Sequence, residues 1–180
     1  MLLEPSRSLL FLVDLQERLA PAIEDGAAVV RRSAILLEAA ARLGVPAIVS
    51  EQYPQGLGHT VPDLARLVEG ATVLPKTCFS AAGDPAIARH LAELRRDQIV
   101  LGGMETHVCV LQTALKLKQM DYEVAVAADA TGSRHPERRR LGLERMRAHG
   151  VDITDSEMVL FEWMGNSGVP AFRELSRLIR

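Results

Sequence analysis

The sequence has few cysteines and no long hydrophobic run, and each shortage excludes a class of protein. Its two cysteines, Cys78 and Cys109, are too few for a disulfide-rich secreted fold, so we expect free thiols and a cytoplasmic location. No apolar stretch approaches the roughly 20 residues that a membrane-spanning helix needs. The short apolar run before Asp14 lacks a following small-residue cleavage site, so it does not resemble a signal peptide. We therefore expect no membrane partner.

The chain also lacks an excess of charge of either sign. It carries 21 Lys and Arg against 23 Asp and Glu, a formal net charge of -2, which gives no electrostatic reason to expect a nucleic-acid partner. Hydrophobic residues make up 48% of the chain, an ordinary share for a globular protein. A chain of this length buries about 70% of its unfolded surface. We therefore expect a single domain over residues 1–180 that needs no structural metal.

Apolar runs of strand length alternate with stretches of helical spacing. Residues 8–13 form a largely apolar run, typical of a parallel strand that is buried on both faces, and 98–101 form another predicted strand. The other predicted strands are 47–49, 71–74, 122–127 and 151–153. The predicted helices are 27–43, a short one ending near 68, 85–96, a helix from the Cys109 region to about 120, 137–149, a helix after Asp155, and 170–180. This alternation predicts an α/β fold with three layers, in which helices cover both faces of a six-stranded parallel sheet.

Several polar residues directly follow the predicted strands. In parallel sheets, ligands bind outside the carboxyl ends of the strands. That rule selects Asp14, the loop at 50–60, Lys76, the turn at 102–109 and Asp129 as candidates for one cleft.

Cys109 stands where a strand pattern changes to a helix pattern. We interpret Gly102-Gly103 as the strand-to-helix turn, which places the cysteine at a helix N-terminus. There the positive end of the helix dipole favours thiolate over thiol, and the free backbone N–H groups are suited to bind an oxyanion. The pattern therefore predicts a nucleophilic cysteine.

Asp14 and Lys76 supply what such a cysteine needs. A carboxylate can take the thiol proton, and a nearby ammonium favours the charged forms of both groups. Together the three side chains predict nucleophilic attack on an amide or a similar electrophilic carbon. Each also has a structural interpretation: a buried small residue for Cys109, a turn or cap residue for Asp14, and a solvated cation for Lys76.

Four motifs together resemble the isochorismatase-like cysteine hydrolases, in the branch of isochorismatase-domain and YcaC-like proteins. They are VDLQ at 13–16, PKTCFSA at 75–81, GMETHVCV at 103–110 and VAADATGSR at 126–134. The resemblance covers about residues 8–135. It implies a Rossmann-like fold, a small-molecule substrate, assembly into a homo-oligomer, and a catalytic triad of Asp14, Lys76 and Cys109.

The same resemblance implies the details of the turn before the cysteine. It predicts a cis peptide bond between Met104 and Glu105, with the backbone N–H groups of Glu105 and Cys109 forming the oxyanion hole. Gln16, Tyr53, Phe79 and Thr106 are assigned to substrate binding. The alternative to substrate binding is a solvated loop position for Gln16 and packing in the core for Phe79. His107 is a weaker candidate for a base, because residues i and i+2 of a helix do not face each other.

The loop at 50–60 argues against a metal. Nicotinamidases carry an Asp-x-His element and further histidines as metal ligands, whereas this loop has Glu51, Gln52, Tyr53 and a single His59. We therefore expect no metal and no cofactor.

Three other functions compete with a cysteine hydrolase. A catalytically silent binding or scaffold protein would keep the fold without the chemistry. A nucleotide-binding Rossmann domain is disfavoured because VDLQERLAP, not a glycine-rich turn, follows the first strand. A zinc site from Cys78, His107 and Cys109 has no supporting ligand spacing.

Overall fold

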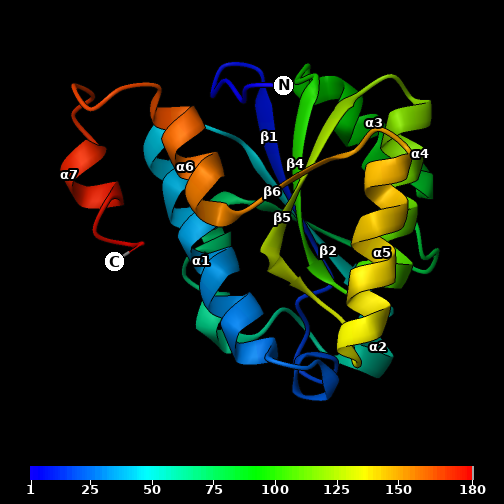
Figure 1. Ribbon diagram of the computed structural model, residues 1–180. Coiled ribbons are helices and arrows are strands. Elements are labelled where there is room, and N and C mark those ends of the chain that lie inside the picture. The colour runs from blue at the N-terminus through cyan, green and yellow to red at the C-terminus, as the bar shows by residue number, and fades with distance from the viewer. Residues whose placement is uncertain (180) are drawn as a thin grey trace.

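A six-stranded parallel sheet forms the centre of the computed structural model, which describes residues 1–179 (Figure 1). The strand order is β3-β2-β1-β4-β5-β6. The strands are β1 Ser8–Val13, β2 Ala47–Gln52, β3 Thr72–Lys76, β4 Gln98–Met104, β5 Glu123–Gly132 and β6 Asp152–Thr154. Each pair of neighbours is parallel. The prediction of an α/β fold with this sheet is confirmed.

Helices cover both faces of the sheet (Figure 1). One face carries α1 Gly26–Leu43, α6 Ser156–Met164 and the short α7 Phe172–Leu175. The other carries α3 Pro85–Leu94, α4 Leu111–Gln119 and α5 Pro136–Ala148. The short α2, Pro54–Leu57, lies beyond the end of β2. Single turns of 3-10 helix occupy Ala20–Ala22, Pro62–Leu64, Val68–Gly70 and Ala81–Gly83.

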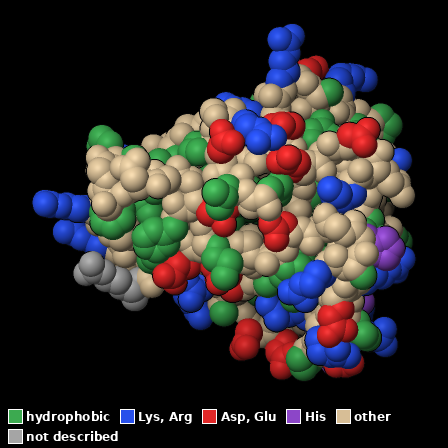
Figure 2. Space-filling model, turned by 45° about the horizontal axis from the view of Figure 1, so that its top comes forward, with side chains coloured by type: hydrophobic (Ala, Val, Ile, Leu, Met, Phe, Trp, Pro, Cys, Tyr) green, Lys and Arg blue, Asp and Glu red, His purple; other side chains and the backbone are tan. Residues whose placement is uncertain are grey.

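Side chains of the central strand β1 alternate between two cores. Leu10 and Leu12 pack with α1 and α6, whereas Leu9, Phe11 and Val13 pack with the helices of the opposite face. This explains why residues 9–13 are apolar without a break, since a strand covered on both faces has no polar side. On the outer surface shown in Figure 2, Lys and Arg side chains are interspersed with Asp and Glu. Within residues 1–179, the helices are too short or too polar to span a bilayer.

The glycine pair Gly102-Gly103 lies inside β4, so the prediction of a turn at these residues is wrong. Both glycines pair with β1, opposite Leu12 and Val13. Gly103 has φ +119, and a Cβ atom built on it would overlap the backbone of Val13. The glycines therefore allow β1 and β4 to approach closely, and the turn begins only after Met104, the last residue of β4.

Other boundaries also differ from the prediction. β2 continues to Gln52, into the predicted 50–60 loop, and only isolated 3-10 turns stand where a short helix was expected before residue 68. β5 runs to Gly132, which places Asp129 inside the strand and not at its end. The predicted helix at 170–180 is reduced to the four residues of α7, and its last residue, 180, lies outside the described residues.

Candidate functional site

The structure brings Asp14, Lys76 and Cys109 together at the carboxyl edge of the sheet. Asp14 directly follows β1, and Lys76 is the last residue of β3. The Lys76 Nζ atom lies 2.7 Å from Asp14 Oδ2, and neither side chain has exposed surface. Cys109 is buried, and its thiol lies close enough to the Asp14 carboxylate for the two groups to shift each other's pKa. A buried carboxylate thus touches both a cation and a thiol.

The backbone at Asp14 is held in an unusual conformation. Its φ is 56°, in the left-handed region that Asp tolerates better than most residues. The Ser50 hydroxyl, from the neighbouring strand β2, donates to Asp14 Oδ1 at 2.8 Å. The carboxylate therefore has one oxygen held by Ser50 and the other by Lys76.

Lys76 crosses beneath β2 to reach Asp14, and Gln52 helps to hold it there. The Lys76 ammonium donates to Gln52 Oε1 at 2.7 Å and to the carbonyl oxygen of Cys78 at 3.3 Å. The sequence analysis missed both Ser50 and Gln52. A signal was present, because these two polar residues stand two apart on one strand and so share a face of the sheet.

Cys109 lies on a π-helical turn, Thr106–Val110, and α4 follows. Burial and the Asp14 carboxylate raise the pKa of the Cys109 thiol to about 12, although Lys76 acts in the opposite direction. The expectation of a resting thiolate is therefore wrong. The dipole of the helix does not compensate for the removal of the sulfur from water and the negative charge beside it.

Asp14 is suited to take the proton that Cys109 holds. Burial raises the pKa of its carboxyl group, whereas the charge and hydrogen bond of Lys76 act in the opposite direction. Raising the pKa of a carboxylate makes it a stronger base. The site is therefore a protonated thiol facing a base of increased strength.

The turn between β4 and Cys109 contains a cis peptide bond between Met104 and Glu105. The Glu105 carbonyl oxygen accepts from the N–H groups of Val108 and Val110, both at 3.1 Å. Next to it, the buried Thr106 Oγ1 has no hydrogen-bond partner among the described residues. A buried hydroxyl without a partner is costly, and a ligand is one way to satisfy it.

Gln16 is buried, and its side chain hydrogen-bonds to backbone groups. The alternative interpretation, a solvated loop residue, is therefore wrong. Its Nε2 atom donates to the carbonyl oxygens of Gln52 and Gly58, at 3.0 and 2.7 Å, and its Oε1 accepts from the Gln52 N–H at 2.8 Å. The side chain therefore fastens the 50–60 segment to β1.

Glu51 makes polar contacts within the same segment. It accepts from the N–H and hydroxyl of Thr60 and contacts His59 Nδ1 at 3.0 Å. His59 itself is largely exposed. The loop at 50–60 is therefore held in place by polar contacts at both its ends.

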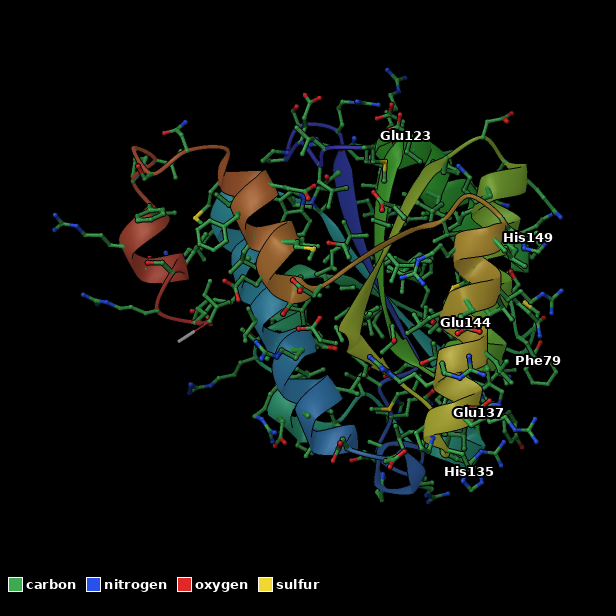
Figure 3. The ribbon with its side chains drawn as sticks, viewed as in Figure 1. Phe79, Glu123, His135, Glu137, Glu144 and His149 are labelled. Carbon is green, nitrogen blue, oxygen red and sulfur yellow. The ribbon has the colours of Figure 1, made fainter. Side chains whose placement is uncertain are left out.

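Tyr53 and Phe79 carry exposed aromatic rings; the Tyr53 N–H donates to the Lys76 carbonyl oxygen at 2.9 Å, and Phe79 follows Lys76 by three residues in the chain. They are 55% and 56% exposed, so core packing of Phe79 is excluded, and Figure 3 shows it at the outer margin of the molecule. A cavity of about 240 Å³ is lined by Tyr53, Lys76 and Asp84, among others.

Asp129 and His107 do not join this group. Asp129 accepts from the N–H and hydroxyl of Ser156 and pairs with Arg32, so it ties β5 to α6 and α1. His107 Nδ1 lies 3.0 Å from Ser133 Oγ. Among residues 1–179, no cluster of three or more His, Cys, Asp and Glu side chains is placed to hold a metal, which includes the Cys78, His107 and Cys109 alternative.

The family model described as the isochorismatase domain matches residues 8–158. Isochorismatase domain-containing protein 1 of Danio rerio is 42% identical over 179 residues, covering 99% of this chain and 62% of the relative. The chain thus spans less than two thirds of that relative's length.

Solved structures share the fold. The MAR1 ribonuclease of Caenorhabditis elegans superposes with a TM-score of 0.94 and 37% identity, covering 99% of this chain and 92% of that one. The YcaC gene product of Escherichia coli, an octameric hydrolase of unknown specificity, gives a TM-score of 0.88 and 21% identity, with 98% and 95% of the two chains covered. At that identity the likeness shows the fold alone.

Proposed function

The chain belongs to the isochorismatase family, and from this premise we propose that it is a cysteine hydrolase of small amide-like substrates, with Asp14, Lys76 and Cys109 as its triad. The observation that carries the proposal is the contact of one buried carboxylate with both an ammonium and a thiol. A carboxylate in that position costs free energy to bury, so a chemical role is a better explanation than stability.

The proposed reaction has two stages. As the Cys109 sulfur attacks the substrate's carbonyl carbon, Asp14 takes the thiol proton, and a covalent tetrahedral adduct forms. Asp14 then passes that proton to the departing amine nitrogen, which leaves a thioester on Cys109. In the second stage Asp14 takes a proton from water, the hydroxide attacks the thioester, and the proton returns to the sulfur as the acid product leaves.

Lys76 and the backbone stabilise charge in this scheme. Lys76 keeps Asp14 charged until the thiol proton is transferred, since the ammonium lies against the carboxylate. The N–H groups of Glu105 and Cys109 are the proposed donors to the oxyanion. Thr106 contributes its unpaired hydroxyl, and Tyr53 and Phe79 flank the substrate's route.

Burial favours a small substrate over a polymer. Asp14, Lys76 and Cys109 are each less than 10% exposed, so the reacting group must reach a narrow centre. The Caenorhabditis elegans relative is named a ribonuclease, and RNA is the second candidate substrate on the strength of its 37% identity. An RNA chain would have to bring a backbone phosphate to these buried residues, whereas a small amide could enter as a whole molecule.

The central test compares the two cysteines. Purified protein is screened against small amides and carbamoyl compounds, with an RNA oligonucleotide in parallel and with a chelator present, since no metal is part of the proposal. We expect Cys109→Ala to abolish turnover and the covalent adduct seen by intact-mass spectrometry, with a thermal midpoint within a few degrees of wild type.

Cys78→Ala is the matched control and should retain turnover, because Cys78 contributes only its backbone carbonyl oxygen to the site. Undiminished turnover in Cys109→Ala would overturn the mechanism. A protein that forms no adduct with any compound, and whose Cys109 is no more reactive than Cys78, would instead fit a silent scaffold.

A further inference from the structure

The ion pair of Asp14 and Lys76 joins two strands that are not neighbours in the sheet. Asp14 follows β1 and Lys76 ends β3, and β2 lies between these two strands. Ser50 and Gln52 stand two residues apart on β2, so their side chains share one face of the sheet. Ser50 pairs in register with the residue before Asp14, and Gln52 pairs with Lys76 itself. Each end of the ion pair therefore has one polar neighbour from β2.

Each of these neighbours offers the group that its end of the ion pair requires. The Ser50 hydroxyl donates to Asp14 Oδ1 at 2.8 Å, and Gln52 Oε1 accepts from the Lys76 ammonium at 2.7 Å. A donor thus faces the anion and an acceptor faces the cation, which favours the charged form of both groups. Because Ser50 and Gln52 are uncharged, neither replaces Asp14 or Lys76 as an ionic partner.

The contacts of the Lys76 ammonium account for all of its hydrogens. An ammonium carries three N–H donors. Their acceptors are Asp14 Oδ2 at 2.7 Å, Gln52 Oε1 at 2.7 Å and the Cys78 carbonyl oxygen at 3.3 Å. The Lys76 side chain has no exposed surface. Lys76 therefore acts on the reaction through Asp14, and it has no donor left for the carbonyl oxygen of a substrate.

The amide of Gln52 can serve Lys76 in one orientation only. Its Nε2 atom donates to the Thr77 carbonyl oxygen at 2.8 Å. A flipped amide would place the NH₂ group against the ammonium and its own oxygen against that carbonyl oxygen. The Gln52 backbone is held in turn by Gln16, which accepts from its N–H at 2.8 Å and donates to its carbonyl oxygen at 3.0 Å. Gln52 is thus fixed in place without a substrate.

We propose that Ser50 and Gln52 are positioning residues that hold Asp14 and Lys76 as a charged pair, and that Gln52 keeps Lys76 bound to Asp14 and away from the substrate. The proposal rests on the proposed function, because Asp14 needs to be positioned only if it is the base. Besides Ser50, the groups that face Asp14 are the Lys76 ammonium and the Cys109 thiol. The charge of Asp14 should therefore respond to a change at either position of β2.

Nitrogen-proton correlation NMR of the lysine ammonium groups, recorded on the full chain, tests the role of Gln52. The chain has three lysines, and the other two, Lys116 and Lys118, lie on α4, one exposed and one partly exposed. We expect a Lys76 signal whose hydrogens exchange with water more slowly than theirs. Gln52→Met removes the acceptor at similar volume and should speed this exchange by about tenfold or more, as expected for the loss of a hydrogen bond to a charged group.

The carboxyl carbon signal of Asp14, assigned with Asp14→Asn and followed against pH, tests the roles of both residues. Gln52→Glu keeps the shape of the side chain but adds a second carboxylate beside Lys76, and Ser50→Ala removes a donor from the Asp14 carboxylate. Each change should raise the pKa of Asp14, so that its titration midpoint moves upward by about 1 pH unit or more. Gln119→Glu is the matched control, since it adds the same charge at the exposed end of α4, and it should leave the midpoint unchanged.

Two results would overturn the positioning role. One is an exchange rate of the Lys76 ammonium that is the same in wild type and in Gln52→Met. The other is an Asp14 midpoint that moves in neither Gln52→Glu nor Ser50→Ala. Both measurements are independent of turnover, so they separate this proposal from the proposed function. If both gave the expected shifts while Cys109→Ala retained turnover in the amide screen, the ion pair would be positioned as described and the cysteine mechanism would be wrong.

Discussion

Cys109 rests as a thiol because it is buried and because Asp14 lies beside it. The carboxylate that is proposed to activate the sulfur also repels the negative charge that activation creates, and it raises the thiol pKa. Proton transfer must therefore accompany attack and cannot precede it. At the residue scale, reactivity toward a small alkylating agent and turnover of substrate become separable properties.

Asp14→Asn should separate them. Burial is the largest cause of the rise of the Cys109 pKa to about 12, and the charge and hydrogen bond of Asp14 add to it. Removal of the carboxylate removes that added part, so iodoacetamide should alkylate Cys109 at lower pH than in wild type. Turnover should fall by roughly 10²–10⁴, the usual contribution of a general base. The alkylation rate is followed against pH by intact mass.

The exposed Asp63→Asn serves as the control and should change neither property. An alkylation profile of Asp14→Asn that coincides with that of wild type would show that the carboxylate does not govern the thiol.

Thr106→Val tests the unpaired hydroxyl. Because Thr106 Oγ1 has no partner among the described residues, its replacement by a methyl group should leave the free energy of unfolding unchanged or raise it by about 1 kcal/mol. KM for substrate should rise if the hydroxyl binds the ligand. Chemical denaturation and steady-state kinetics give the two quantities.

Thr113→Val is the matched control, since Thr113 Oγ1 accepts from the buried Ala81 N–H at 2.9 Å. That variant should lose about 1–3 kcal/mol of stability. Equal losses in both variants would show that Thr106 already has a partner in solution.

The sequence was enough to select Asp14, Lys76 and Cys109, because Asp14 and Lys76 lie at the ends of predicted strands, Cys109 begins the helix that follows another, and the carboxyl ends of parallel strands meet at one edge. It was not enough to find Ser50 and Gln52. Their role depends on β2 lying between β1 and β3, and the order of strands in a sheet is not encoded in any local pattern. The thiol pKa also escaped prediction, since it depends on burial more than on the helix.

At the element scale, β4 differs most from its prediction. A glycine pair before a helix is typical of a turn, yet here it continues the strand, because β1 passes too close for a side chain at Gly103. The local sequence shows that glycine stands at these positions but not why it is required. The reason is the contact with β1, where Val13 lies 90 residues before Gly103.

Gly103→Ala should therefore be strongly destabilising. The methyl group would overlap the backbone of Val13, and the φ of +119 is unfavourable for alanine, so we expect a loss of about 3 kcal/mol or more. Gly150→Ala, which also has positive φ but open space around it, should lose only about 1 kcal/mol. Urea denaturation measures the free energy of unfolding of both variants. Similar losses would show that the unfavourable φ alone, without the overlap with Val13, explains the loss in Gly103→Ala.

At the scale of the whole molecule, the exposed apolar side chains suggest contact with further copies. Met158 and Phe161 lie one turn apart on α6 and are 52% and 43% exposed, whereas Trp163 on the same helix is buried and donates to Ser8 Oγ. Large exposed apolar side chains that cluster mark interaction surfaces more often than isolated ones do. We propose a homo-oligomer, as the family resemblance implies.

Native mass spectrometry should give a multiple of the 19.7 kDa chain mass. A single species at the mass of one chain, at all protein concentrations tested, would contradict assembly.

The order of the strands has a further consequence, for the way the polypeptide matures during synthesis. β1, β2 and β3 are adjacent in the sheet and all lie within residues 8–76, so Asp14 and Lys76 can meet as soon as that segment has left the ribosome. β4 covers the other edge of β1 and brings Cys109 only afterwards. Until then the apolar edge of β1 is unpaired, and a nascent chain at that stage depends on rapid translation or on chaperones to avoid aggregation. The ion pair can thus form before the segment that carries the nucleophile has left the ribosome.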